Sequence, residues 1–309
     1  MSKKYFATTV VADAHPSDIY GLDTTPSVVV SASGDSAVRV WAASGDHAPL
    51  YTISTAHRVG IHHVATCTER GLVAFAGFDG TISIWTLAEP AACLVTISDD
   101  KVSFWAIRFS PEGEYLAATS LDGKVYIYSV GDDSSTLSGV LDTRGTPGLS
   151  LDYSLNARFI ASGHENGGVY IFSTETARLL HSLPGHVKAV RAVAFSPKSS
   201  LLAAAGDSSI ITLYDVKSGE QIFNLAGHTK WVMSLDWNFT GEQLLSAAFD
   251  SSLRVWSIEQ RENVATHTEA DSMLWTARWV KAPTGPDVFV SGGFNALRFY
   301  REATGTGGQ

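Results

Sequence analysis

Histidine, serine, aspartate and tryptophan occur twice in the same order along this sequence. The two sets are His15, Ser31, Asp35, Trp41 and His228, Ser246, Asp250, Trp256. A serine activated by a histidine, with a carboxylate that orients the histidine, is the arrangement that acyl-transfer enzymes use. Catalysis is therefore the first hypothesis that these residues raise, and the elements that hold them must decide between catalysis and structure.

Other residue patterns that could support chemistry are sparse. His62 and His63 are adjacent, so on a strand their side chains should point to opposite faces and could not share a metal ion. The glycine-rich stretch GTPG at 145–148 is not followed by a helical pattern, which argues against a phosphate-binding loop. We therefore expect no catalytic site, no cofactor and no metal, and predict that the protein is not an enzyme.

Composition limits the partners that this chain can have. Its 309 residues carry a formal net charge of −9, and lysine and arginine form no run. Direct binding to RNA or DNA is therefore not expected, because such proteins display a basic stripe. The longest apolar stretches, such as 201–206, are far shorter than a membrane span. The two cysteines and the lack of a signal-peptide pattern in residues 1–15 predict an intracellular protein without disulfides.

A repeat of about 43 residues organises the whole chain. A turn residue followed six places later by an aromatic residue recurs seven times, ending at Trp41, Trp85, Tyr128, Phe172, Tyr214, Trp256 and Tyr300. The intervals between these aromatic residues are 44, 43, 44, 42, 42 and 44 residues. Repetition at this period is typical of propellers and other repeat architectures.

Each repeat contains four short runs with strand character. In the sixth repeat they are residues 231–237, 243–248, 252–256 and 263–267. Four antiparallel strands repeated seven times predict an all-β fold, a seven-bladed β-propeller. The last repeat has only three strands, and the spare N-terminal strand at residues 5–11 should complete its blade and close the ring. We expect one domain over residues 1–302 and a disordered tail over 303–309.

Over residues 5–300 the sequence resembles the WD-repeat family. Gly-His precedes the first strand at 185–186 and at 227–228, and weaker Ala-His versions contain His15 and His57. The resemblance implies that the histidine, serine, aspartate and tryptophan of each set form a buried hydrogen-bonded relay within one blade, where every polar group has to be paired. The sets recur with the repeat and lie inside a sheet, so we interpret them as structural relays.

Three tryptophans, Trp105, Trp231 and Trp275, are not explained by the repeat. When the first strands are aligned on their terminal aromatic residues, Trp105 and Trp275 are equivalent, and Trp231 lies two residues before that position. First strands line the channel of a propeller, so their starts should meet at one rim. We expect this rim to carry Tyr20, His62, Phe78, Trp105, Leu121, Arg191, Trp231, Met233, Phe249 and Trp275. Such side chains suit a docking site for a short peptide of a partner. The alternative is that they fold inward and plug the channel.

Four stretches resemble, more specifically, the WD-repeat subunits of the superkiller complex. They are residues 103–128, 141–145 (LDTRG, in place of a Gly-His turn), 177–197 and 227–237. The resemblance implies a non-catalytic scaffold in a cytoplasmic assembly with an RNA helicase and a tetratricopeptide-repeat scaffold, which feeds messenger RNA to the exosome for 3′-to-5′ decay. It also implies a protein that is monomeric alone, is present in two copies in the complex, and grips a short motif through its top face.

Other functions of similar propellers stay open at this point. Related proteins serve in a nuclear transcription-elongation assembly and in the initiation of meiotic recombination, so the expected localisation is cytoplasmic and also nuclear. A histone-peptide or ubiquitin-ligase adaptor would need an acidic rim. A propeller enzyme would need acidic or histidine side chains that converge in the channel, where the first strands offer mainly His62, His63, Asp152 and Asp236.

Overall fold

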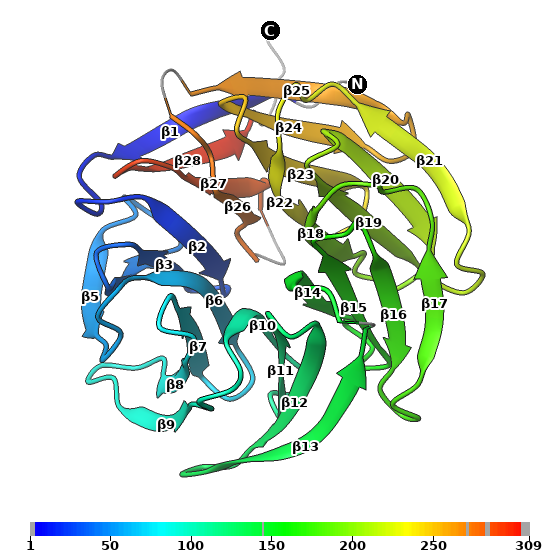
Figure 1. The fold of residues 1–309 in the computed structure, drawn as a ribbon. Helices are drawn as coiled ribbons and strands as arrows, with labels where there is room; N and C mark the ends of the chain where they lie inside the picture. The colour runs from blue at the N-terminus through cyan, green and yellow to red at the C-terminus, as the bar shows by residue number, and fades with distance from the viewer. Residues whose placement is uncertain (1–3, 144, 270–271, 282–284, 304–309) are drawn as a thin grey trace, which may run out of the picture.

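The chain folds as a ring of small sheets around a central channel (Figure 1). The computed structural model describes residues 4–143, 145–269, 272–281 and 285–303, which form twenty-eight strands in seven four-stranded sheets. The predicted all-β, seven-bladed β-propeller is confirmed. No membrane-spanning helix occurs in the described ranges, which contain only strands, turns and loops. The predicted tail, apart from Ala303, lies outside the described residues.

The first four sheets, blades 1 to 4, each use four consecutive strands, which follow one another from the channel outward. Blade 1 contains β2 (Ile19–Thr24), β3 (Val28–Ser33), β4 (Ala37–Ala42) and β5 (Pro49–Ser54). Blade 2 contains β6 (Ile61–Cys67), β7 (Leu72–Gly77), β8 (Ile82–Thr86) and β9 (Cys93–Ile97). Blade 3 contains β10 (Phe104–Phe109), β11 (Tyr115–Ser120), β12 (Lys124–Val130) and β13 (Ser135–Asp142). Blade 4 contains β14 (Gly148–Tyr153), β15 (Phe159–His164), β16 (Val169–Ser173) and β17 (Leu179–Leu183).

The remaining sheets, blades 5 to 7, include the one that joins the two ends of the chain. Blade 5 contains β18 (Val190–Phe195), β19 (Leu201–Gly206), β20 (Ile210–Asp215) and β21 (Gln221–Ala226). Blade 6 contains β22 (Val232–Trp237), β23 (Gln243–Ala248), β24 (Ser252–Ser257) and β25 (Glu262–Thr268). Blade 7 contains β26 (Thr276–Trp279), β27 (Val288–Gly292), β28 (Leu297–Glu302) and β1 (Tyr5–Val11).

The burial of each strand follows from its place in the blade. Second strands such as β7 (LVAFAG) are buried along their whole length, because neighbouring blades cover both faces of the sheet. Their sequences are therefore continuous apolar runs of small and branched residues. Outermost strands such as β21 expose most of their side chains to solvent and keep only Leu225 fully buried. This gradient directs polar residues to the outside of the ring and apolar residues between the blades.

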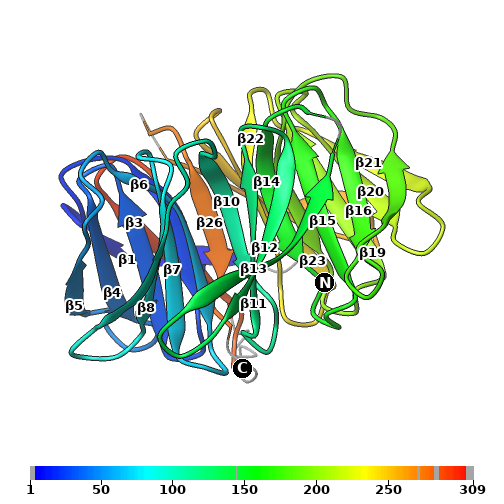
Figure 2. The ribbon, with the colours of Figure 1, turned by 60° about the horizontal axis from the view of Figure 1, so that its bottom comes forward.

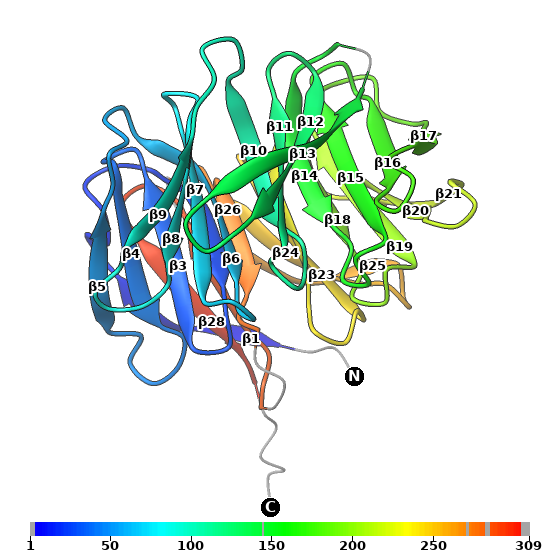
Figure 3. The same cartoon turned by 90° about the horizontal axis from the view of Figure 1, so that it is seen from below.

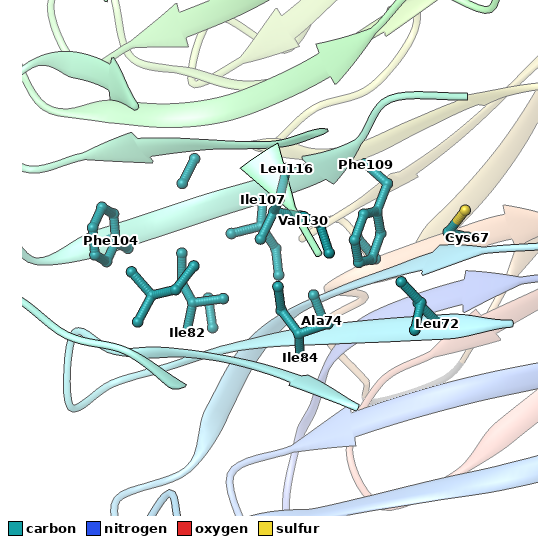
Figure 4. Packing of buried hydrophobic residues seen from close by; sticks show 14 of the residues in the cluster. Cys67, Leu72, Ala74, Ile82, Ile84, Phe104, Ile107, Phe109, Leu116 and Val130 are labelled. Carbon is teal, nitrogen blue, oxygen red and sulfur yellow. The ribbon is translucent and has the colours of Figure 1, made fainter. Parts of the chain in front are cut away.

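Clusters of buried apolar side chains fill the gaps between neighbouring blades. Between blades 2 and 3, Ile82 and Ile84 of β8 face Phe104 and Ile107 of β10 (Figure 4). The described residues contain seven such clusters, one for each pair of neighbouring blades. Burying each of these large side chains contributes roughly 1.5–3 kcal/mol. The blades thus stabilise one another, because the apolar packing lies between neighbouring blades around the channel.

The ring closes through the N-terminal strand, as the spare strand predicts. β1 pairs antiparallel with β28, in a register that runs from Tyr5 opposite Glu302 to Val11 opposite Leu297. The two strands lie side by side in Figure 3, where β1 is blue and β28 is red. The ring of Tyr5 meets that of Trp279 edge-on, with centroids 5.7 Å apart. This pairing gives blade 7 four strands like the other blades, and it covers the edge of β28.

Candidate partner-binding rim

The side chains predicted for the rim gather at one end of the channel. A cavity of about 390 Å³ opens there and is lined by Tyr20, His62, Phe78, Trp105, Arg191, Met233 and Trp275, among others. Trp231 and Phe249 lie at its edge, against Arg191 and Trp275 respectively. Leu121 lines an adjoining hollow together with Trp105. We call these ten residues the rim. They come from six different blades, and Figure 1 looks down the channel past the first strands that carry five of them.

A repeated β-bulge aims these side chains at the mouth of the channel. Near the start of β2, β6, β14, β18 and β22, the pairing with the second strand skips one residue, and in β10 it skips two. The skipped residues include Tyr20, His62, Trp105, Leu149, Arg191 and Met233. A bulge bends its strand and redirects the side chain that it carries. Because the first strands run in the same sense along the channel (Figure 2), one backbone device presents a side chain to the same mouth in successive blades.

One half of the rim is a continuous series of contacts from blade 5 to blade 7. The guanidinium carbon of Arg191 lies 4.4 Å from the centre of the Trp231 ring, and Arg191 also forms an ion pair with Asp207. Trp231 stacks on Phe249, with ring centroids 5.8 Å apart. Phe249 in turn meets Trp275 edge-on at 4.7 Å. Each ring is held by its neighbours, so this surface is ordered before any partner arrives.

The other half continues the series across blades 1 to 3. Tyr20 meets Trp275 edge-on at 4.7 Å and Phe78 at 5.4 Å, measured between ring centroids. Phe78 lies 4.9 Å from His62, whose ring stacks on Trp105 at 4.3 Å. The aromatic side chains of the rim therefore form one belt that passes around most of the mouth and ends at Trp105.

Exposure separates the side chains that face solvent from those that support them. Phe78, Leu121 and Trp231 are 44%, 47% and 43% exposed, whereas His62 is only 8% exposed. Burial lowers the pKa of His62 to about 4, so its imidazole is neutral at neutral pH. His62 therefore supports the ring of Trp105 and has little surface of its own to offer a partner. The mouth is neither flat nor filled, since the cavity remains open beside the exposed rings.

His62 and His63 both line the cavity, which corrects the expectation that they point to opposite faces. The bulge at His62 interrupts the strict alternation on which that expectation depended. Among the residues that the structure describes, no group of three or more histidine, cysteine, aspartate or glutamate side chains could hold a metal ion.

In blade 6 the set of histidine, serine, aspartate and tryptophan is a buried relay. Ser246 Oγ lies 2.7 Å from His228 Nε2 and accepts a hydrogen bond of 2.8 Å from Trp256 Nε1. His228 Nδ1 lies 3.0 Å from a carboxylate oxygen of Asp250. Burial alone would raise the pKa of Asp250, but hydrogen bonds from His228, Ser252 and a backbone amide hold it well below its usual range. The relay ties the loop that leads into the first strand of the blade to its second and third strands.

Blade 1 repeats the same arrangement with nearly the same distances. Ser31 Oγ lies 2.8 Å from His15 Nε2 and accepts a hydrogen bond of 2.9 Å from Trp41 Nε1. His15 Nδ1 lies 3.1 Å from Asp35. His15 and Ser31 are both fully buried, which leaves no path for a substrate to the serine. Burial lowers the pKa of His15 to about 4.

Comparison with known proteins identifies the family to which this chain belongs. A model of the WD domain, G-beta repeat, matches residues 91–129, 177–215 and 219–257. Meiotic recombination protein rec14 of Schizosaccharomyces pombe is 38% identical over 305 residues, which cover 98% of this chain and 99% of that protein. Antiviral protein SKI8 of Saccharomyces cerevisiae is 30% identical over 329 aligned positions, which cover 86% of this chain and 83% of that protein. The chain belongs to the WD-repeat family.

Each matched segment of this WD-repeat protein spans two blades. The segment 177–215, for example, begins just before β17 at the outer edge of blade 4 and ends at the third strand of blade 5. A sequence repeat is therefore offset from a structural blade by one strand. The same offset explains why β1 is needed to complete blade 7, and it means that every repeat connects two neighbouring blades covalently.

The WD-repeat protein also contains a third, shorter relay without a tryptophan, which reasoning from the sequence missed. His57 Nδ1 lies 2.9 Å from Asp79, and His57 Nε2 lies 2.9 Å from Ser83 Oγ. Ser83 belongs to the third strand of blade 2, whereas Ser31 and Ser246 belong to second strands. A sequence search that expects the serine on the second strand cannot find this relay, although His57 and Asp79 occupy the expected positions in the sequence.

Blade 7 has a different buried polar group in the same place. Glu269, only 4% exposed, accepts a hydrogen bond of 2.9 Å from Tyr300 Oη and further hydrogen bonds from Ser291 and Arg298. A carboxylate here replaces the histidine of the other relays and joins the second and third strands of the blade.

Carboxylates that line the channel join neighbouring blades of the WD-repeat protein. Asp152 of β14 accepts a hydrogen bond of 2.7 Å from the backbone of Phe195 in blade 5, and it pairs with Arg108 of blade 3 at 2.9 Å. Asp236 accepts a hydrogen bond of 2.7 Å from the backbone of Trp279 in blade 7. Burial raises the pKa of Asp236 above its usual value. Both carboxylates thus have partners in adjacent blades.

Three further residues extend the rim beyond those found from the sequence. Leu149 lines the cavity at the bulge of blade 4. Met273 and Phe294 of blade 7, at positions equivalent to Trp231 and Phe249, are 54% and 57% exposed. The alignment of the first strands on their terminal aromatic residues already makes Leu149 equivalent to Trp105 and Met273 equivalent to Trp231, so the signal for these two residues was present in the sequence. Phe294 was passed over because the seventh repeat has asparagine in place of the turn aspartate.

Proposed function

We propose that this WD-repeat protein is a non-catalytic scaffold that binds a short segment of a partner protein at the rim. The observation that carries the proposal is the continuous aromatic belt, which passes around most of an open cavity and includes two side chains, Phe78 and Trp231, that are more than two-fifths exposed. Large, pre-ordered aromatic side chains beside an arginine are the residues that dominate binding at protein interfaces. A partner segment would place apolar side chains in the cavity and a polar group near Arg191 and Asp207.

The assembly that we propose for this scaffold is a superkiller-type complex. In that role it would connect a tetratricopeptide-repeat scaffold and an RNA helicase, in two copies, and support exosome-mediated 3′-to-5′ decay of messenger RNA in the cytoplasm. The 30% identity with SKI8 over most of both chains supports this role. The acidic balance of the chain, with a net charge of −9, fits a subunit that contacts other proteins while the helicase contacts RNA.

A second candidate is a role in meiotic recombination in the nucleus. It is favoured by the 38% identity with rec14, which extends over nearly the whole of both chains. The two roles are compatible, because one rim can bind segments of different proteins at different times.

Affinity purification of the tagged protein from its native cells tests these assignments. We expect a helicase and a tetratricopeptide-repeat scaffold to co-purify from vegetatively growing cells, and recombination proteins to join them in cells entering meiosis. A version with Trp105→Ala, Trp231→Ala and Trp275→Ala, shown to be folded by circular dichroism, should lose these partners. If both forms retrieve the same partners, the rim is not the docking site. If neither retrieves either assembly, the assignment to these complexes is wrong.

A further inference from the structure

The face opposite the rim, which we call the far face, carries an apolar hollow at the other mouth of the channel. This hollow has a volume of about 500 Å³, and buried Trp237 and Trp279 contribute to its lining. Leu155 and Phe239 also line it, and they are 63% and 65% exposed. Loop tips are normally polar, so two large apolar side chains that flank a cavity are a feature that the fold itself does not require. The turn between β22 and β23, which carries Phe239, is at the lower edge of the molecule in Figure 3.

The turns that carry these side chains are fixed against one another. The backbone amide of Asn156, next to Leu155, donates a hydrogen bond of 3.3 Å to Ser199 Oγ of blade 5. A Cβ at Gly241 would lie 3.2 Å from Cδ of Pro197, so the turn of blade 6 packs closely on that of blade 5. The hollow is therefore a preformed surface and does not depend on a loop closing over it.

Two further hollows extend from the apolar one across blades 2, 3 and 4, with volumes of about 660 and 330 Å³. All three hollows are lined in part by Tyr153, so they form one depression, which we call the far-face groove. Exposed glutamates border it, namely Glu69, Glu112, Glu114 and Glu175. Burial and the nearby Glu112 raise the pKa of Tyr153 to about 12, in keeping with a tyrosine that lies among carboxylates.

Within the described part of the chain, none of these four glutamates takes part in an ion pair, because the cations that line the groove have other partners. Arg70 donates to two backbone carbonyls, at 3.0 and 2.6 Å, and pairs with Asp132. Arg108 pairs with Asp152 and Asp23, and Lys281 also lies 3.6 Å from Asp23. The groove thus has an apolar end and an acidic end, and the acidic end has unmatched negative charge.

We propose that the far-face groove binds an extended, basic segment of a second partner protein. An apolar side chain of that segment would lie between Leu155 and Phe239, and its lysine or arginine side chains would pair with the glutamates that border the groove. Tyr153, at the junction of the three hollows, offers a ring face to the cationic side chains. The two mouths lie at opposite ends of the channel, and between them five residues line both the rim cavity and the far-face hollow, namely His63, Leu151, Val193, Leu235 and Arg278. The protein can therefore hold two segments at once, and this proposal does not depend on what occupies the rim.

Selection of peptides from a displayed random library against the full-length chain tests the proposal. We expect a class of peptides that combines leucine or phenylalanine with several lysines or arginines. Fluorescence anisotropy with the labelled peptides should show at least tenfold weaker binding to Phe239→Ser, and likewise to the double variant Glu112→Lys/Glu175→Lys. Binding of this class should weaken as salt is added and should be unchanged by Trp231→Ala at the rim. The substituted far-face side chains are exposed, so circular dichroism should show an intact fold.

Four outcomes would overturn the proposal. Selection could yield no basic class, or it could yield peptides that bind equally well to the far-face variants. The selected peptides could all be lost with Trp231→Ala, which would place them at the rim. Sedimentation velocity could also show a dimer that Phe239→Ser converts to monomers, in which case the occupant of the groove is a second copy of this chain.

Discussion

Replacing the serine at the centre of the blade 6 relay separates a structural role from a catalytic one. Ser246 Oγ serves both His228 Nε2 at 2.7 Å and Trp256 Nε1 at 2.8 Å, and it is fully buried. In Ser246→Ala both nitrogens lose their partner at a site where water cannot replace it. A buried polar group left without a hydrogen bond costs roughly 1–3 kcal/mol, so the variant should lose about 2–6 kcal/mol of unfolding free energy.

Thermal unfolding followed by circular dichroism measures this loss. For a chain of 309 residues that unfolds as one unit, each kcal/mol corresponds to about 1.5 °C in Tm, so Ser246→Ala should melt about 3–9 °C below wild type. Ser138→Ala, on the exposed outer strand of blade 3, is the matched control and should melt within about 1 °C of wild type.

A double-mutant cycle sharpens the result. In Ser246→Ala/Trp256→Phe the indole N–H that would be left unpaired is also removed. The double variant should therefore lose less stability than the two single variants added together, by about 1 kcal/mol or more. If Ser246→Ala melts like wild type, or if the two effects are additive, the relay does not stabilise the blade through these hydrogen bonds and the reasoning fails.

Three further predictions follow from the channel, the titrating groups and the closure. Arg108→Met leaves the buried carboxylate of Asp152 unpaired and should lower the unfolding free energy by about 3–5 kcal/mol in a urea titration, whereas a change below about 1 kcal/mol would contradict the role of the ion pair. Burial lowers the pKa of His15 to about 4, so below pH 6.5 the unfolded chain takes up a proton that the folded chain excludes. The free energy of unfolding should therefore be highest above the unfolded pKa of about 6.5 and should fall as the pH drops toward 4. A Tm that is equal at pH 7 and pH 5 would refute this. Tyr5→Ala should cost about 3–5 kcal/mol by denaturant titration and Phe6→Ala, half exposed on the same strand, much less, whereas equal losses would mean that Tyr5 does not anchor the closure.

The architecture could be predicted because its determinants repeat along the sequence at a nearly constant period. Terminal aromatics such as Trp85 and Trp256 recur at nearly constant intervals, and the turns between the runs contain glycine, aspartate and serine. The spare strand at residues 5–11 likewise follows from counting strands in the last repeat. Each of these signals can be counted along the sequence, so none of them required knowledge of how blades pack.

The rim was harder to predict because its geometry depends on strand register. Nothing in the residue types around His62 indicates that the pairing with β7 slips by one residue there, and that slip brings His62 and His63 to the same cavity. The relay of blade 2 was concealed for a similar reason, because Ser83 lies on a different strand from its counterparts. The aromatic contacts that pass from Trp231 to Trp105 join residues from different blades, and only the closed ring brings them together.

The most direct test of the docking rim is the binding of the co-purifying tetratricopeptide-repeat scaffold to wild type and to Trp231→Ala. Trp231 is 43% exposed, so its removal should leave the Tm within a few degrees of wild type. Val187→Ala serves as the control. Among the large apolar residues that the structure describes, Val187 is the most exposed, at 87%. We predict that Trp231→Ala weakens the affinity at least tenfold, as loss of an interface anchor does, while Val187→Ala binds like wild type. Undiminished affinity in a folded Trp231→Ala variant would contradict the account.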